Sequence, residues 1–512
     1  MTRRFRTFPE QTTDLLIHSI AWVVVCAALL NAGLFVWYTA NPVLRSDDWY
    51  SLDVFLRKAI EGHLGLADFF TRRYVDDHAQ PLLKLIELAE WRWFDLDCSV
   101  GSVLGLAAAG TVALILHRVV MATRGAPGQN AHRFIAWATL SAVLFSLNAS
   151  EIWTWPLAAL GYVTFVPVLL FFLVVWRAWN RRCLVLLTTA TFLLCVLADD
   201  VALIAETSAL VALTVLAWRE PGRPRAHFWK MVVVMAVCTG LVRVMYSFAP
   251  LLDATPGMSM TTRLAALTRD LHRGAAWQWI SIPLSSSVAW RNPFGSVSTD
   301  AWSAVSTAFV LCLLLAHVAF WWRALRGEQT LPTFVAMGLM LLSYGLLAGI
   351  ILIRVSLLGS GYLGQQRYVE FYQINLVAML LMWAGTQMPG PLESGLRRWL
   401  VQYVPASGCV ILLLLQLPFA RMAWMQRPYE LAYYARMAVQ IRQLTVSPEQ
   451  TTDCLPELVV CHWPLERRQA VMQLLSRYRL NVLSRRVQAR HIFLPNLDSG
   501  AQQSTLAARR LR

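Results

Sequence analysis

The sequence predicts an all-α polytopic membrane protein with about eleven transmembrane helices. Of its 512 residues, 57% are hydrophobic and only 15% are charged, whereas soluble domains carry about 25% charged residues. Apolar runs recur from near the N-terminus to about residue 418, and each approaches the ~20 residues that a helix needs to cross a bilayer core. Positive charge gathers in alternate loops between these runs, as is typical of multi-pass membrane proteins.

Eleven apolar runs supply the predicted spans. The first run, at about 15–38, is too long for the core of a signal peptide, so we expect it to remain as the first helix. Two later runs, centred near Leu193 and Ala209, are short and closely spaced. The other centres, including that of the first run, lie near Val25, Ala109, Leu140, Leu169, Val237, Leu311, Leu342, Ala378 and Leu413.

Alternate loops differ in charge, and this difference predicts the orientation of the chain. One set of loops is short and basic; it contains Arg3, Arg4, Arg6, Arg118, Arg124, Arg133, Arg177, Arg181, Arg182, Arg219, Arg223, Arg225, Lys230, Arg323, Arg326, Arg397 and Arg398. The positive-inside rule places this set and the N-terminus in the cytoplasm, with the chain in the cell inner (plasma) membrane. The other set, including the tail after about residue 419, then faces the periplasm or the outside; it comprises residues 39–99, 149–160, 198–200, 249–300 and 354–370.

The chain divides into three predicted parts. These are a transmembrane module at 1–419 with large outer loops at 39–99 and 249–300, a small outer C-terminal domain at 420–498, and a disordered tail at 499–512. Apolar positions recur at helical spacing over 52–60 and 82–89. This spacing predicts helices that lie along the membrane interface within the first outer loop.

The outer C-terminal domain is predicted to be a small α/β appendage. Residues 429–444 and 467–478 have the pattern of helices, and residues 458–461 and 492–494 have the pattern of short strands. Cys454 and Cys461 are candidates for a local disulfide in an oxidising compartment, with two free thiols as the alternative.

The net charge of +15 indicates membrane lipid rather than nucleic acid as a partner. The arginines lie mainly at helix ends and in the C-terminal tail, where positive charge sets topology and contacts anionic lipid. A lipid-phosphate substrate is compatible with the same charge.

Two acidic motifs lie in the first outer loop. Asp47 and Asp48 follow the first span within a few residues, where a carboxylate can take a proton from an acceptor hydroxyl. The alternative is a cap for the helix that begins near Ser51. Further on, Asp76, Asp77 and His78 are candidates to orient an acceptor, to bind a divalent cation, or to cap the helix that begins near Pro81. No spaced set of histidines and cysteines is present, so a metal stays an open question and no cofactor is assigned.

Other outer residues are candidates for binding sugar or phosphate. Glu151 and Trp153 lie in a tryptophan-rich turn that suits sugar recognition, although an interfacial tryptophan belt explains them equally well. Guanidinium groups suit phosphate, so the candidates for a phosphate site are Arg354 and the pair Arg367-Tyr368, with Lys84 and then Arg72, Arg73, Arg243 and Arg291 behind them. Ordinary interfacial anchoring is the alternative.

A further acidic pair lies where apolar spans meet the outer side. Asp199, Asp200 and the nearby Glu206 stand at membrane depth, where acids are costly and are functional candidates. Extension of the side chains of Asp199 and Asp200 to water is a sufficient alternative explanation.

The order of a first span, an acidic pair, an interfacial helix and then Asp77-His78-Ala79-Gln80-Pro81-Leu82-Leu83-Lys84 resembles the GT-C superfamily of membrane glycosyltransferases. The likeness is greatest to the protein O-mannosyltransferase and aminoarabinose-transferase branch, from which this chain departs by having Ala79-Gln80 where one proline would stand. It covers residues 10–100. The resemblance implies that Asp47 or Asp48 is the catalytic base and that the donor is a sugar on a polyprenyl phosphate such as undecaprenyl phosphate. It also implies inversion at the sugar carbon.

The expected function is therefore transfer of a hexose or pentose to a cell-envelope glycan, lipid or protein on the outer face. In that interpretation Asp76, Asp77, His78 and Gln80 contact the acceptor or the sugar. The alternative function is a secondary transporter or flippase of a lipid-linked or anionic substrate, which would need broken helices in repeated halves. A non-catalytic scaffold is the third possibility.

Overall fold

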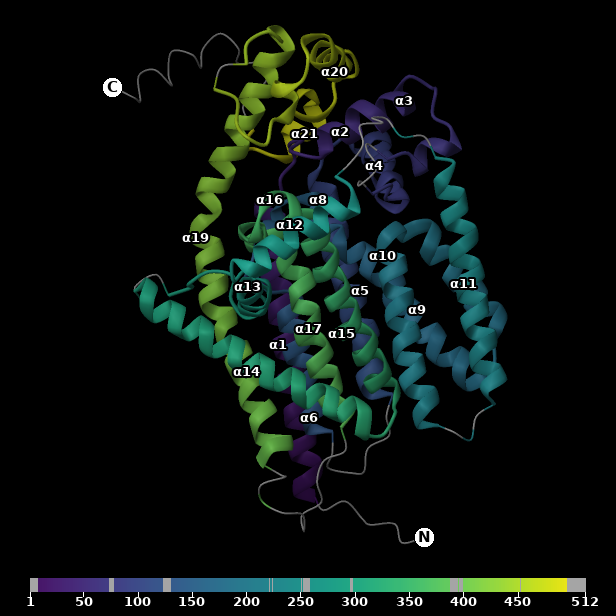
Figure 1. Cartoon of the computed structure of the whole chain (residues 1–512). Helices are drawn as coiled ribbons and strands as arrows, with labels where there is room; N and C mark the ends of the chain where they lie inside the picture. The colour runs from purple at the N-terminus through teal and green to yellow at the C-terminus, as the bar shows by residue number, and fades with distance from the viewer. Residues whose placement is uncertain are drawn as a thin grey trace.

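The computed structural model describes residues 8–72, 78–122, 130–220, 222, 224–249, 251, 258–294, 298–386, 395, 399–451 and 453–494. Within these residues the regular secondary structure is helical, with no strand. Long helices run side by side between two ends of the molecule, with the N-terminus at one end and a unit of short helices at the other (Figure 1).

Eight helical stretches among the described residues are long and apolar enough to cross a membrane, so the prediction of a multi-pass membrane protein is confirmed in this form. They comprise α1 (Phe8–Thr39), α5 (Ser99–Met121), α8 (Pro156–Ala159) with α9 (Gly161–Arg181), α10 (Leu184–Arg219), α11 (Arg225–Ser247), α14 (Thr299–Arg326), α15 (Leu331–Ile350) with η3 (Ile351–Val355) and α16 (Ser356–Leu358), and η6 (Trp399–Tyr403) with α19 (Val404–Val446). The predicted number of eleven is not reproduced. Two further predicted spans, α6 (Ala131–Leu144) and α17 (Val369–Ala384), are shorter helices of 14 and 16 residues.

Helix α10 is not one straight rod, because it turns back on itself at Asp199. This residue has φ 47° and ψ −122°, outside the helical region. The thiol of Cys195 lies 2.5 Å from Oε1 of Glu206, although a continuous helix would separate two residues eleven apart by ~16 Å. The two arms of α10 are therefore antiparallel, and they correspond to the runs centred near Leu193 and Ala209.

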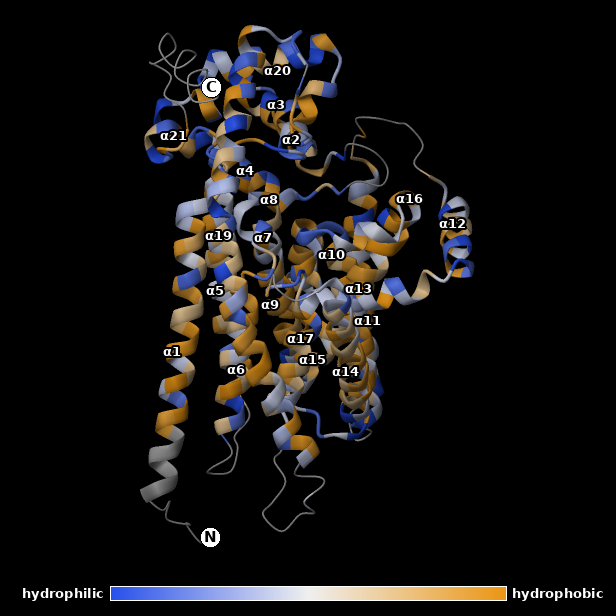
Figure 2. Cartoon of the chain, turned by 90° about the vertical axis from the view of Figure 1, so that its left-hand side faces the viewer, coloured by the Kyte–Doolittle hydropathy of each residue, from blue (hydrophilic) through white to orange (hydrophobic). Residues whose placement is uncertain are grey.

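The loops of the two predicted sets meet at opposite ends of the bundle. At the end with the N-terminus, which we call the basic end, Arg219 donates to the carbonyl oxygens of Arg326 at 3.0 Å and Gly327 at 3.3 Å. At the other end, which we call the acidic end, the amide of Ala79 donates to Asp199 at 2.8 Å. Figure 2 shows hydrophobic residues along the long helices and many hydrophilic ones in the short helices at the acidic end.

The first outer loop forms helices where the apolar spacing predicts them. Residues 52–60 lie in η1 (Leu52–Leu56) and α3 (Arg57–Ile60), after α2 (Asp48–Ser51), and 82–89 lie in α4 (Pro81–Phe94). Pro81 is the first residue of α4, a position that needs no backbone donor. The other short helices at the acidic end are η2 (Leu66–Phe70), α7 (Glu151–Thr154), α12 (Met260–His272), α13 (Ala276–Val288), η4 (Ser360–Gly364) and η5 (Gln366–Tyr368).

The C-terminal unit, which we define as residues 430–451 and 453–494, is helical, so the predicted α/β appendage is wrong. It contains the end of α19, η7 (Val459–His462), α20 (Leu465–Tyr478), η8 (Asn481–Leu483) and α21 (Arg485–Arg490). The two predicted strands instead form local backbone hydrogen bonds. The amide of Cys461 donates to the carbonyl of Leu458 at 2.9 Å, and the amide of Leu494 donates to the carbonyl of His491 at 2.9 Å. Short apolar runs do not distinguish strands from tight helical turns. The tail at 499–512 lies outside the described residues.

Two of the hydrophobic clusters among the described residues are far larger than the others. One lies among the long helices and includes buried residues of α1, α5, α6, α9, α10, α15 and α17. The other, at the acidic end, joins Trp49, Leu52 and Phe55 of the first loop to Ile441 and Val471 of the C-terminal unit. The structure also pairs Cys454 with Cys461 in a disulfide. The first loop and the C-terminal unit thus fold around one shared core.

We predict that Gly105→Ala destabilises the bundle. A Cβ atom at Gly105 would overlap the backbone carbonyl of Ala159, which a side-chain rotation cannot relieve. The expected loss is ~1–3 kcal/mol, read as a lower Tm in detergent. Gly110→Ala on the same helix is the control, since nothing lies within 4 Å of the added atom; an equal effect of both variants would refute the close approach of α5 and α8.

Candidate functional site

A cavity of about 480 Å³ opens at the acidic end and is lined by polar groups from distant segments. Many of the residues predicted from the sequence line it together. They are Asp47, His78, Gln80 and Lys84 of the first loop, Arg354 of η3, and Arg367 and Tyr368 of η5, with Asp199 and Asp200 of α10. The predicted acidic and basic groups therefore converge on one space.

A second cavity, of about 190 Å³, adjoins the first and is largely apolar. Its wall includes Phe165 and Val168 of α9, Leu342 of α15, and Ile374 and Val377 of α17. The two cavities share several lining residues, namely Gln80, Leu83, Leu157, Thr164, Val201, Leu346, Arg367, Tyr368 and Phe371. The larger cavity thus carries most of the charged side chains, and the smaller, more apolar one adjoins it between the long helices.

The two aspartates of the first motif have different surroundings. Asp47 lines the polar cavity, whereas Asp48 does not. A carboxylate oxygen of Asp48 accepts the backbone N–H of Arg45 at 3.1 Å. Burial raises the pKa of Asp48 to about 7, with the charge of Glu87 adding to the effect and the Arg45 hydrogen bond opposing it. Of the two aspartates, Asp47 is therefore the one that faces the cavity.

The turn in α10 places Asp199 and Asp200 against His78 and Arg243. Nδ1 of His78 lies 3.0 Å from Asp200, and Asp199 accepts the amide of Ala79 at 2.8 Å. Nη1 of Arg243 pairs with Asp199 at 3.3 Å and with Asp200 at 2.7 Å. Asp199 is almost fully buried, while 42% of the Asp200 side chain is exposed. The pair therefore has specific partners rather than only water.

His78, Asp199 and Asp200 also have the geometry of a possible metal site. Their candidate ligand atoms lie within 4.8 Å of one another, and one imidazole with two carboxylates is a suitable donor set for a divalent cation. Arg243 already supplies positive charge to both carboxylates. A cation would have to share or replace that role.

The predicted phosphate site is partly assembled. Arg367 contacts aromatic rings on several sides, with its guanidinium carbon 5.5 Å from the ring centre of Trp155, 5.5 Å from that of Tyr362 and 5.3 Å from that of Tyr368. It also donates to the hydroxyl of Tyr362. These contacts orient the guanidinium at the boundary of the two cavities, and Arg354 lines the same polar chamber.

Lys84, which was a further candidate for the phosphate site, bonds through its ammonium to the backbone of the first loop. Its ammonium donates to three backbone carbonyl oxygens, those of Asp68 at 3.0 Å, Phe69 at 3.1 Å and Thr71 at 2.7 Å. An ammonium has three donors, so these bonds account for them. Lys84 instead ties α4 to the segment around η2.

Glu151 and Trp153 also have structural partners instead of a sugar-facing position. Glu151 forms an ion pair with the buried Arg45 at 2.6 Å. Trp153 is 1% exposed, and its indole N–H donates to the carbonyl of Ser146 at 2.9 Å. The tryptophan that lines the apolar cavity is Trp155, two residues further along. Asp76 and Asp77 lie outside the described residues.

The chain matches no protein-family model, no curated protein and no solved structure.

We predict that Asp48→Asn removes a pH-dependent cost to stability. The folded-state pKa of Asp48 is near 7, above the usual 3.8, so the fold favours the protonated side chain. The stability of the fold is therefore not reduced by Asp48 below about pH 4, and it falls progressively as the pH rises from there through 7. The variant should therefore gain a few degrees of Tm over wild type at pH 8 and little at pH 4. A constant difference at both pH values would contradict the buried environment of Asp48.

We predict that Arg243→Ala creates a cation-dependent stability. Without the guanidinium, two adjacent carboxylates and one imidazole remain, and Mg²⁺ or Mn²⁺ should raise the Tm of the variant more than that of wild type. Adding Asp200→Asn to Arg243→Ala should abolish the gain. A gain that survives the second substitution would place the cation elsewhere.

Proposed function

We propose that the protein is an outward-facing membrane glycosyltransferase that uses a sugar linked to a polyprenyl phosphate. The observation that carries this proposal is the pair of adjoining cavities, one lined by several charged side chains and the other mainly apolar, with Arg367 and Tyr368 in the wall of both. A lipid-linked sugar phosphate has the same division into an apolar chain, an anionic linker and a polar head. The acidic end would face outward, as the basic residues at the other end favour.

In the proposed reaction, Asp47 acts as the general base. It takes the proton of an acceptor hydroxyl, whose oxygen forms a bond to the anomeric carbon of the sugar. The bond between that carbon and the phosphate oxygen breaks, and its electron pair leaves with the lipid phosphate. Attack from the face opposite the leaving group inverts the anomeric centre.

The cationic groups of the cavity would stabilise the leaving phosphate. Arg367 lies at the junction of the two cavities, where the phosphate of a donor with its lipid in the apolar cleft would sit. Guanidinium binds phosphate oxygens through two parallel N–H donors. Arg354 is a second cationic side chain that lines the same chamber.

A secondary transporter or flippase is the second candidate, and the turn in α10 favours it. Helices interrupted near a charged site are common in transporters, and Asp199 lies at such an interruption. A flippase would move a polyprenyl-phosphate sugar from one leaflet of a vesicle membrane to the other without consuming it. Release of polyprenyl phosphate therefore separates the two functions.

We predict that Asp47→Asn lowers turnover by ~10²–10⁴-fold because it removes the general base. The assay uses purified protein with polyprenyl-phosphate hexoses and pentoses and a cell-envelope acceptor extract, and it measures release of polyprenyl phosphate. Asp48→Asn should keep most of the turnover, since that side chain does not line the cavity and asparagine can still accept the Arg45 N–H.

The outcomes separate the competing assignments. Full turnover in a correctly folded Asp47→Asn protein would refute the base assignment. Loss in Asp48→Asn alone would assign the base to the other aspartate. Movement of intact donor between leaflets, with no release by wild type, would replace the transferase by the flippase.

A further inference from the structure

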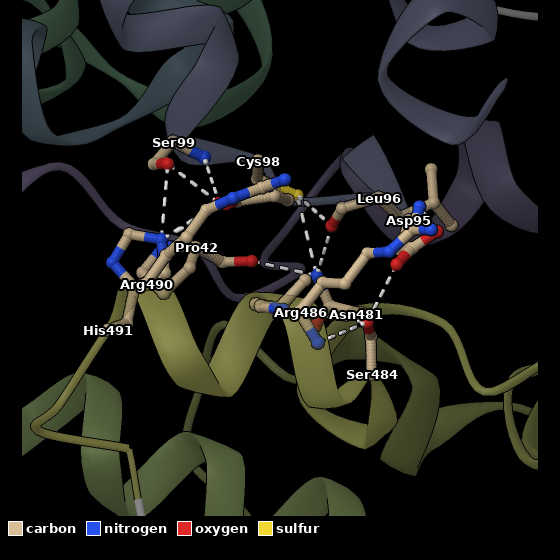
Figure 3. A network of polar contacts seen from close by, with 12 residues as sticks. Pro42, Asp95, Leu96, Cys98, Ser99, Asn481, Ser484, Arg486, Arg490 and His491 are labelled. Carbon is tan, nitrogen blue, oxygen red and sulfur yellow. Dashed lines mark hydrogen bonds and ion pairs between the residues drawn. The ribbon is translucent and has the colours of Figure 1, made fainter. Parts of the chain in front are cut away.

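The segment that carries Asp47 is held in place by the C-terminal unit. Nδ2 of Asn481 donates to the carbonyl oxygens of Pro42 at 2.7 Å and Leu96 at 2.6 Å. Its Oδ1 accepts the amide of Leu44 at 3.4 Å. Asn481 is fully buried. Figure 3 shows it between the segment at Pro42, where the first loop begins, and the segment at Leu96, where it ends. One side chain thus joins both ends of that loop.

Two more contacts flank Asp47 directly. The amide of Ser46 donates to the carbonyl oxygen of Glu457 at 2.7 Å. Beyond α2, Nε of Arg467 pairs with the buried carboxylate of Asp53 at 2.6 Å. The residues immediately before and shortly after Asp47 are therefore both fixed by the C-terminal unit.

The far end of the first loop is attached to the same unit. The carboxylate of Asp97 is 1% exposed and pairs with Arg490 at 3.1 Å and His491 at 3.0 Å. Although burial alone would raise the pKa of Asp97, the hydrogen bonds and charge of His491, with Ser99 and Arg490, hold it below its usual value. The hydroxyl of Ser484 donates to Asp95 at 2.8 Å.

The disulfide stiffens the part of the unit that contacts Ser46. Glu457 lies inside the short ring closed by Cys454 and Cys461. Its carboxylate accepts the hydroxyl of Tyr433 on α19. The carbonyl that bonds Ser46 is therefore carried by a ring anchored to a long helix.

We propose that the C-terminal unit is a positioning element of the candidate active site, with Asn481, Glu457 and Arg467 as positioning residues for Asp47. None of the three lines the polar cavity, so they act through the first loop: Asn481 and Glu457 bond its backbone and Arg467 pairs with the Asp53 side chain. The effect on turnover rests on the proposed transferase function, whereas the effect on the loop does not. A shift of a reacting group by 1 Å can cost about 10²-fold in rate, which makes this support consequential.

The test compares Asn481→Asp with Gln488→Leu in the full-length protein. Asn481→Asp removes the donor to two buried carbonyls, while Gln488 donates only within the C-terminal unit, to the carbonyl of Val482 at 2.7 Å. We expect amide hydrogen exchange of Ser46 to become at least about tenfold faster in Asn481→Asp, the equivalent of one lost hydrogen bond. Gln488→Leu should leave it unchanged.

The same variants are then compared in the release assay and in binding of polyprenyl phosphate alone. We expect kcat of Asn481→Asp to fall by about 10–100-fold with Kd for polyprenyl phosphate unchanged, because Arg367 lies outside these contacts. Arg467→Gln, at a side chain that is 38% exposed, is the milder second variant if the first misfolds, and Arg467→Lys should restore part of the loss.

The readouts distinguish failure of this inference from failure of the proposed function. Unchanged exchange at Ser46 in both Asn481→Asp and Arg467→Gln overturns the positioning role. Faster exchange without any release activity in wild type retains the attachment and rejects the transferase. Faster exchange with full kcat would show that the loop does not need this support for catalysis, and it would also overturn the proposal.

Discussion

The ion pairing of Arg243 with Asp199 and Asp200 is the interaction on which the rest of the site depends. Two adjacent carboxylates at the end of apolar helices carry a large desolvation cost unless a cation compensates them. Arg243 supplies that charge, and its Nη2 also donates to the carbonyl of Asp199 at 3.2 Å, where the helical bonding is interrupted. The turn of α10 can therefore exist at this depth. Because Asp199 then accepts the amide of Ala79, the turn also anchors the start of α4 in the cavity wall.

The features that sequence reasoning found are those set by local composition. Long apolar runs identify spans wherever a helix lies in an apolar environment, and the proline at position 81 marks the start of α4. The grouping of acids at one end follows from the loop alternation. The cysteines at 454 and 461 are close enough in sequence to suggest the disulfide that the structure contains. The count of spans was less predictable, because α6 and α17 are short and α10 turns within one apolar stretch.

The features that sequence reasoning missed depend on partners that lie further away in the chain. Lys84 has the charge of a phosphate ligand, but carbonyl oxygens 13 to 16 residues earlier occupy its ammonium. Glu151 is paired with an arginine 106 residues away. Arg243 lies in an apolar helix 43 residues after Asp200, and nothing in the sequence near either residue indicates that the two pair. Residue type states what a side chain can do, whereas the fold decides which of its possible partners it meets.

The distribution of charge in the polar cavity determines how the proposed donor would be oriented in it. Asp47 and Asp200 would repel a phosphate, because like charges repel strongly in a partly desolvated space. Arg367 stands at the junction with the apolar cleft, which is where the charge of a lipid phosphate falls when its chain occupies that cleft. The sugar then extends toward the carboxylates, away from the lipid. One arrangement satisfies the apolar wall, the guanidinium and the proposed base at once, and it requires that Asp47 be held at a constant distance from the bundle. The attachment of the first loop to the C-terminal unit meets that requirement.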